Sequence, residues 1–241
     1  MPTLLGPVDW FPLWLSLRVA ALATVVSAGV GLALAYLLAN FEFRGKEALD
    51  ALTTLPIVLP PTVLGYYLLV LVGRRGVFGE WLARLGIELV FTWQGAVLAS
   101  TIVAFPLVLK SARAAFEGVD HQLENAARVL GVPEAGIFFR VTLPLAARGI
   151  IAGVLLAFAR ALGEFGATLM IAGNLPGRTQ TLSVAIYEAV QAGDDNTANL
   201  LVLVTSVTCV LLLVVAGRLV PAATRNPAEL YERRRLRPRI R

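Results

Sequence analysis

The sequence contains one cysteine, one histidine and few charged residues. Cys209 lies inside an apolar stretch and His121 has no cysteine or second histidine beside it, so neither a disulfide framework nor a Cys/His zinc site is expected. No set of nucleophile, base and metal ligands converges, which argues against a membrane enzyme. A Gly-x-x-x-x-Gly-Lys-Ser/Thr phosphate loop is also missing, so ATP hydrolysis by that route is not expected. We therefore predict no catalytic residues, no cofactor and no metal.

The composition indicates an integral membrane protein. Charged residues make up 15% of the chain, against about 25% in soluble proteins, and the mean hydropathy is +0.74. Crossing about 30 Å of hydrocarbon takes roughly 20 residues, and five stretches are long enough: 13–39, 51–72, 92–109, 149–173 and 198–217. Backbone groups in lipid must be satisfied internally, so these stretches are expected to be helices. The predicted fold class is all-α, a polytopic membrane protein with a single transmembrane domain over 1–241.

The distribution of Lys and Arg predicts the orientation. With the N-terminus outside, fifteen of these residues fall on the inner side, in 40–50, 110–148 and the tail 218–241, and four fall outside. The positive-inside rule therefore places the loop 110–148 and the C-terminus in the cytoplasm. Topology also explains the net charge of +5, so no nucleic-acid partner is expected. The stretch 181–192 is short and contains Glu188, and a span there would move the tail outside, so it is predicted to be non-spanning or re-entrant.

The two ends of the chain add little beyond the spans. No positive residue precedes the first stretch and its apolar run exceeds a signal-peptide core, so it is expected to remain as a membrane anchor. No regulatory domain is expected in residues 218–241, which follow the last stretch.

Three prolines interrupt the second predicted span. Pro56, Pro60 and Pro61, followed by Thr62, remove backbone donors and should break or kink the helix. Irregular backbone at membrane depth is tolerated only inside protein or beside a cavity. We interpret Pro60, Pro61 and Thr62 as part of a translocation path or gate; the alternative is a kink that serves packing alone.

The fourth predicted span contains two charges, Arg160 and Glu164. Four residues apart, they would share one helix face and could pair. Neither should face lipid, because each alone would cost about 2.5 to 3.5 kcal/mol at the bilayer centre. This face is either part of a water-accessible path for an anion or a buried ion pair that fixes helix packing.

A short amphipathic helix is predicted within the loop 110–148. Its apolar stripe is formed by Val119, Leu123, Ala126, Ala127 and Leu130, which fall at offsets 0, 4, 7, 8 and 11 and so share one helix face. Asp120 is the predicted N-cap and Gly131 the left-handed C-terminal cap, with Pro133 and Glu134 opening a second helix. An ordinary interfacial helix would show the same pattern.

The sequence of this loop resembles the EAA loop of membrane subunits in bacterial ABC importers. The resemblance rests on Ala126-Ala127-x-x-x-Gly131 with Glu124 nearby and Thr142-Leu143-Pro144 downstream. Asn125 stands where common versions of the motif carry glutamate, and Glu124 lies one residue upstream. Longer strings, above all 59–66, 157–167 and 176–181, are similar to the molybdate-type permease subunits of this class.

The resemblance implies a function and a set of partners. The chain would be the permease of an ATP-driven molybdate importer in the bacterial inner membrane, a homodimer that binds two cytoplasmic ATPase subunits and an external oxyanion-binding protein. Glu124, Ala126, Ala127 and Gly131 would belong to a coupling helix that docks on the ATPase.

Two alternatives to molybdate import remain open. Sulfate, thiosulfate or tungstate would suit the same path, since tetrahedral dianions are alike. A self-sufficient secondary anion transporter should show internal repeats and a coupling residue at the midplane; no repeat is evident, and only Arg160 and Glu164 qualify.

Overall fold

A computed structural model describes the backbone of residues 9–219 and the side chains of residues 9–214. Within that range the chain is helical, without strands, which confirms the all-α prediction. The longer helices are α1 (Phe11–Asn40), α2 (Lys46–Val58), α3 (Pro61–Val72), α5 (Trp93–Glu117), α8 (Leu143–Leu162) and α11 (Asp195–Leu219). The shorter ones are α4 (Gly79–Arg84), α6 (His121–Val129), α7 (Glu134–Ile137), the π-helical turn η1 (Phe138–Thr142), α9 (Gly166–Ala172) and α10 (Leu182–Gln191).

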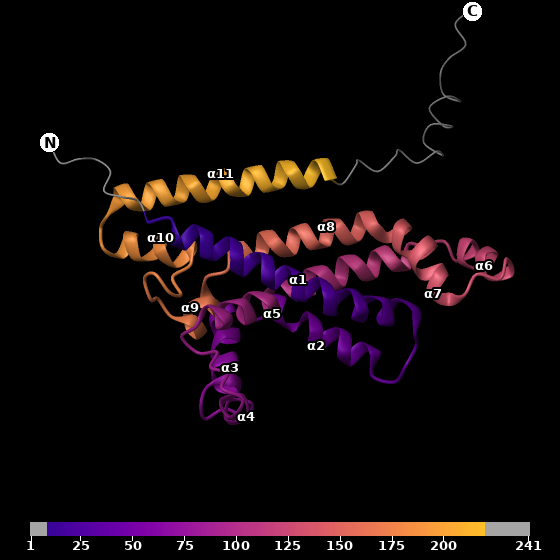
Figure 1. The fold of residues 1–241 in the computed structure, drawn as a ribbon, viewed down its shortest axis with the longest axis horizontal. Helices are drawn as coiled ribbons and strands as arrows, with labels where there is room; N and C mark the ends of the chain where they lie inside the picture. The colour runs from indigo at the N-terminus through magenta and orange to yellow at the C-terminus, as the bar shows by residue number, and fades with distance from the viewer. Residues whose placement is uncertain (1–8, 220–241) are drawn as a thin grey trace, which may run out of the picture.

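Helices α1, α5 and α8 form the central bundle. They run along the long axis of the molecule, with α6 and α7 at one end and α3 projecting sideways with α4 at its tip (Figure 1). Small side chains allow the close approach: a Cβ added at Gly153 of α8 would lie 2.5 Å from the Ser111 Cβ of α5, and one at Gly149 would lie 2.6 Å from the Ala115 Cβ. Small residues at helix contacts are typical of membrane bundles, where van der Waals packing replaces the hydrophobic effect as the attractive force.

The predicted second span is broken at the prolines. Helices α2 and α3 meet at an angle of 116°, so the described residues contain four helices that could cross a membrane, or five if this bent pair counts as one span. α2 buries none of its residues. It is joined to α5 by Asp50, whose carboxylate accepts from Lys110 Nζ at 2.7 Å and from Arg113 Nη1 at 3.0 Å. The break that the prolines predicted in the span 51–72 is thus confirmed, because Pro60 and Pro61 cannot continue the backbone hydrogen bonds of α2.

The predicted fourth span is also divided. α8 ends at Leu162 and α9 begins at Gly166, so an unbroken helix over 149–173 was wrong. The stretch 181–192 forms α10, whose ten residues reach only about 15 Å, too short to span. The Leu182 amide at its start donates to Ser16 Oγ of α1 at 2.7 Å. The remaining predicted spans correspond to α1, α5 and α11, and the basic tail lies outside the described residues from 220 onward.

The close contact between α5 and α8 predicts that one methyl group added at this interface lowers the stability of the fold. Gly153→Ala should destabilise the fold by about 1 to 3 kcal/mol, because its Cβ would overlap Ser111. Gly29→Ala in α1 is the matched control, since a Cβ there meets nothing within 4 Å. The measurement is the thermal unfolding midpoint of each purified variant in detergent; equal midpoints for the two variants would contradict the prediction.

Candidate functional site

The loop between α5 and α8 carries a capped helix, α6, at one end of the bundle (Figure 1). Asp120 is its N-cap and accepts from the Gln122 amide at 2.9 Å. Its C-terminus is closed by Gly131, whose φ of +78° is accessible to glycine at little cost. The Gly131 and Val132 amides donate to the carbonyls of Arg128 and Ala127 at 2.9 and 3.1 Å, which completes the paired hydrogen bonds of a Schellman cap. Both predicted caps are confirmed.

The apolar residues of α6 face away from the bundle. Leu123, Val129 and Leu130 are 49%, 87% and 81% exposed, and Ala126 is exposed beside them. We call these four residues the docking face. Of the predicted stripe, Val119 alone is buried in the bundle core, and Val129 was not part of that stripe. An apolar surface on a helix that projects from the protein is typical of a partner-binding site.

Glu124 occupies the opposite side of α6 and is buried, with 6% of its surface exposed. Its Oε1 accepts from Thr142 Oγ1 at 2.5 Å, and its Oε2 lies 3.1 Å from His121 Nδ1. Burial raises the pKa of the Glu124 carboxyl, but the hydrogen bonds to Thr142 and His121 and the charges of His121 and Arg128 outweigh it, so the pKa lies below its usual value. The carboxylate is therefore ionised at neutral pH and holds α6 against η1.

A second contact restrains α6 at the surface. The Arg128 guanidinium donates through Nε and Nη2 to the two carboxylate oxygens of Glu134, at 2.6 and 3.1 Å, and through Nη1 to Asn125 Oδ1 at 2.8 Å. An exposed ion pair adds little stability. Its two parallel hydrogen bonds nevertheless fix the direction in which α6 leaves α7.

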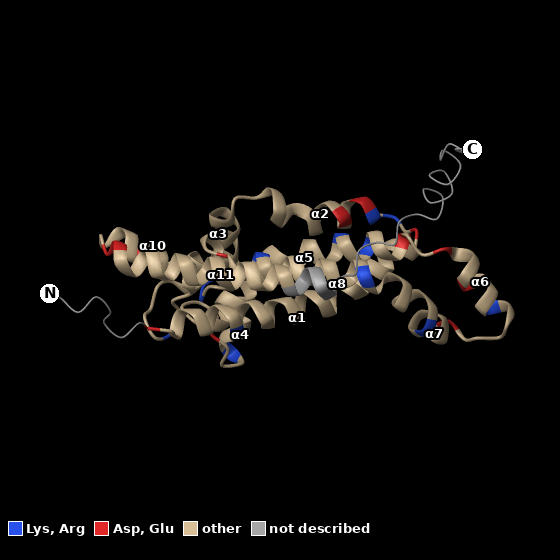
Figure 2. Ribbon diagram, turned by 90° about the horizontal axis from the view of Figure 1, so that it is seen from above, with Lys and Arg blue, Asp and Glu red and all other residues tan. Residues whose placement is uncertain are grey.

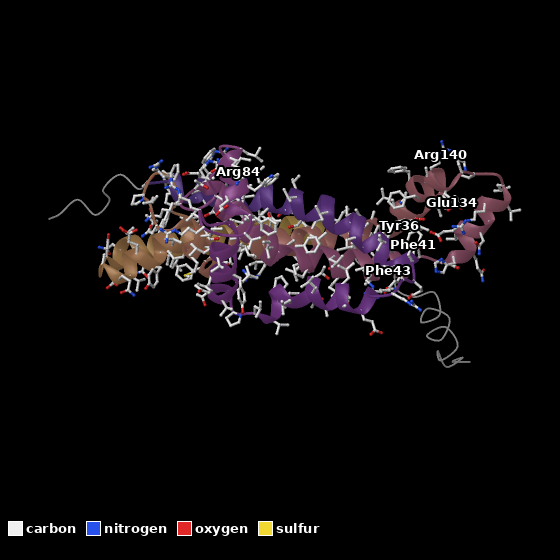
Figure 3. All side chains as sticks on the ribbon, turned by 90° about the horizontal axis from the view of Figure 1, so that it is seen from below. Tyr36, Phe41, Phe43, Arg84, Glu134 and Arg140 are labelled. Carbon is white, nitrogen blue, oxygen red and sulfur yellow. The ribbon has the colours of Figure 1, made fainter. Side chains whose placement is uncertain are left out.

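The turn η1 connects this loop to the bundle. The Phe138 ring packs edge-on against Tyr36 of α1, with ring centroids 4.8 Å apart, and Tyr36 packs in the same way against Phe116 of α5 at 5.5 Å. Tyr36, Glu134 and Arg140 lie together at this end of the molecule (Figure 3). Because η1 runs directly into α8, α6 and α8 are joined by a short, well-packed connection.

The two helix breaks lie against each other deeper in the molecule. A Cβ at Gly166, the first residue of α9, would lie 3.0 Å from the Pro61 Cβ and 3.3 Å from the Thr62 amide nitrogen of α3. Pro60, Pro61 and Thr62 are themselves exposed. The proline break between α2 and α3 thus lies against Gly166, which follows Glu164 by two residues in the chain. Sequence spacing alone did not indicate this contact.

Arg160 and Glu164 form the predicted ion pair, but not on one helix. Arg160 Nη1 donates to Glu164 Oε2 at 2.7 Å. Glu164 lies in the break after α8, where its Oε1 accepts from the Ala167 amide at 2.8 Å. Its side chain is 1% exposed, against 36% for Arg160. Glu164 therefore satisfies a backbone donor of α9 as well as neutralising Arg160.

The sequence located the members of the site but not its internal contacts. Glu124, Ala126, Ala127 and Gly131 all lie in or directly after α6, as predicted. The sequence indicated Thr142 only as part of the string Thr142-Leu143-Pro144 and gave it no role. Its hydrogen bond to Glu124 joins residues that are 18 positions apart. A hydroxyl that satisfies a distant buried carboxylate leaves no periodic signal in the sequence.

Comparison with known proteins identifies relatives along most of the chain. Residues 28–225 match the family model described as binding-protein-dependent transport system inner membrane component. The chain is 46% identical over 209 residues to the molybdenum transport system permease protein ModB of Escherichia coli K12, covering 86% of this chain and 91% of that protein. It is 36% identical over 194 residues to the sulfate transport system permease protein CysT of the same organism, covering 80% and 70%.

Among solved structures, an inward-facing MetNI methionine ABC transporter matches with a TM-score of 0.71 at 18% identity, covering 92% of this chain and all of the matched chain. That likeness supports the fold, and the family assignment rests on the sequence matches. The chain belongs to the family of binding-protein-dependent transport system inner membrane components, the permease subunits of ABC importers.

Proposed function

We propose that this chain forms the translocation path of an ATP-driven molybdate importer. The observation that carries the proposal is the docking face: four apolar residues exposed on a helix that is held rigidly by the buried Glu124. The identity to relatives named as molybdenum permeases supports molybdate as the substrate. Sulfate, thiosulfate or tungstate is the second candidate, supported by the more distant sulfate permease.

The proposed orientation places α6 in the cytoplasm and the N-terminus outside. Lys and Arg positions on the ribbon gather at and beside α2, α7 and α8 at the α6 end, whereas a smaller group lies at α4 (Figure 2). Arg140 lies at the α6 end of the molecule, and Arg84 lies nearer the opposite end (Figure 3). Positively charged residues are retained on the cytoplasmic side of membrane proteins, so the α6 end is the side from which an ATPase would bind.

The proposed assembly contains two copies of this permease, two cytoplasmic ATPase subunits and an external oxyanion-binding protein. Each docking face would lie in a groove of one ATPase. The apolar side chains of Leu123, Val129 and Leu130 would be buried there, and small Ala126 would allow the helix to approach closely.

Coupling would proceed through the connection between α6 and α8. When ATP binding moves the ATPases, α6 moves with them, and the Glu124–Thr142 hydrogen bond transfers the displacement to η1 and α8. The far end of α8 carries Arg160 and leads into the break at Glu164, which lies beside Pro61 and Thr62 of α3. A shift of α8 would therefore change the contact between the two breaks, which we propose as the gate. ATP bound to the ATPase subunits would thereby shift the equilibrium between the two states of this permease.

Arg160 would contact the anion within the path. Its side chain is partly exposed while Glu164 is not, so a dianion could reach the guanidinium without displacing Glu164 from the Ala167 amide. The alternative is that the pair serves helix packing only.

Gly131→Arg should abolish coupling while leaving the protein in the membrane. A non-glycine residue at φ +78° costs about 1 to 2 kcal/mol, and the new side chain would project beside the docking face. Uptake of molybdate and ATP hydrolysis are measured in proteoliposomes of the whole complex, and most of the uptake should be lost. Gly86→Arg, at φ +72° near α4 with no neighbour of its Cβ within 4 Å, is the control. Undiminished uptake by Gly131→Arg would exclude the docking role.

Thr142→Val should weaken coupling, whereas Thr142→Ser should not. The valine leaves the buried Glu124 carboxylate without one donor, a loss of about 1.5 to 3 kcal/mol for a hydrogen bond to a charged group. The readout is uptake per ATP hydrolysed. Because the folded pKa of Glu124 is lowered, its stabilising effect is present above the ordinary carboxyl pKa and is lost only as the pH falls through the folded value. The difference between Val and Ser should therefore be constant around neutral pH; equal coupling in both variants would contradict the role of the hydrogen bond.

The double variant Arg160→Gln, Glu164→Gln distinguishes a role of the ion pair in the translocation path from a role in helix packing. The double variant removes both charges, so no buried carboxylate is left unpaired, and the complex should assemble. If Arg160 contacts the anion, uptake is lost although assembly, measured by size-exclusion chromatography, is normal. Uptake at the level of the unmodified complex would assign the pair to packing.

A further inference from the structure

Arg18 is a charged residue on the exposed face of α1, a helix long and apolar enough to cross a membrane. It lies in the second turn of α1, about 10 Å along the helix axis from Phe11. Arg18 is exposed. On the same side of α1 lie Trp14, Leu22 and Val25, which are 55%, 39% and 68% exposed. An arginine on such an apolar surface requires a partner or access to water.

Aromatic rings hold the guanidinium in place. The Arg18 Cζ lies 4.0 Å from the centroid of the Trp93 ring and 5.2 Å from that of Trp14. Trp93 opens α5, so the contact joins the starts of two parallel helices at the end of the molecule opposite α6 (Figure 1). Tryptophan is enriched where the hydrocarbon meets the headgroups, which places Arg18 near the phosphate level of that leaflet.

No carboxylate neutralises Arg18 in the described part of the chain. Among residues 9–214 every ion pair within 4 Å involves other cations, and Arg160, the other arginine within a predicted span, is paired with Glu164. Residues 1–8, which precede α1, contain neither Asp nor Glu. Ring contacts stabilise the charge through the faces of the guanidinium, and its in-plane N–H groups remain available to an acceptor.

We propose that Arg18, Trp14 and Trp93 bind the phosphate of an anionic phospholipid in the leaflet opposite α6. A phosphate offers two oxygens at the spacing of the guanidinium fork, which lysine cannot match. Its acyl chains would cover the exposed Leu22 and Val25 of α1. Soluble phosphate or a transported oxyanion has the same chemistry, but the exposed apolar side chains of Leu22 and Val25 beside Arg18 favour a lipid. The site shares no residue with the docking face or with the proposed gate, and it does not depend on the proposed function.

The test uses the full chain in nanodiscs that contain phosphatidylglycerol and phosphatidylcholine. Native mass spectrometry after release from the nanodisc reports which lipid stays bound. The unmodified protein should retain phosphatidylglycerol in preference, and Arg18→Gln should lower this preference by about tenfold or more, as expected for the loss of a charge-assisted hydrogen bond. Arg18→Lys should retain less than the unmodified protein, because the charge remains but the planar fork is lost. Arg84→Gln, an exposed arginine of α4 with no ion pair in the described residues, should change nothing.

Three outcomes would overturn the proposal. Equal phosphatidylglycerol retention by Arg18→Gln and Arg84→Gln would remove the basis for the site. A change in the monomer–dimer ratio of Arg18→Gln, with lipid retention unaltered, would show that a second copy of the chain covers Arg18. An Arg18-dependent response of tryptophan fluorescence to inorganic phosphate, in nanodiscs of phosphatidylcholine alone, would assign the guanidinium to a soluble anion.

Discussion

The absence of water from the hydrocarbon interior governs this structure, because each backbone group and charge there must find its partner within the protein. Unbroken helices such as α1 and α5 meet that requirement alone. The breaks do not, and the irregular backbone at both ends of α9 is satisfied by specific contacts. Glu164 accepts from the Ala167 amide where α9 begins, and the Phe91 amide donates to the Ile171 carbonyl where α9 ends. The irregular backbone around α9 is thus satisfied by protein groups.

The same requirement explains why two distant regions can act together. α8 begins at η1, beside the buried Glu124, and ends at Leu162, beside Arg160 and Glu164. Its contact with α5 at Gly153 leaves no space between the helices, so α8 is expected to shift as a rigid body rather than to bend locally. A displacement at α6 would therefore reach the break beside Pro61. The ion pairs of Asp50 with Lys110 and Arg113 restrain α2, which buries no side chain, at the α6 end.

Much of the fold could be predicted from the sequence. Hydropathy located α1, α11 and the start of α5 closely, although α5 continues to Glu117, beyond the predicted end at 109, and the caps of α6 followed from Asp120 and Gly131. The break at Leu162 was missed because Gly163 and Glu164 are compatible with helix, whereas the packing of α9 against α3 and α5 and the hydrogen bond from the Ala167 amide to Glu164 favour the break. The stripe on α6 was predicted, but its direction was not: Leu123 and Leu130 face outward while Glu124 is buried. The inward position of a carboxylate depends on Thr142 and His121, which amphipathic periodicity does not take into account.

The sequence by itself determined that this is an α-helical membrane protein with a capped amphipathic helix between two spans. Those properties depend on hydropathy and on turn chemistry, which act over a few neighbouring residues. Tertiary structure alone decided that Glu124 meets Thr142, that the breaks at Pro61 and Gly166 touch, and that Arg18 lies between two tryptophans. Such contacts join residues far apart in the chain. They arise from the way helices pack, since a local pattern carries no information on which distant side chain will supply the missing hydrogen bond or charge.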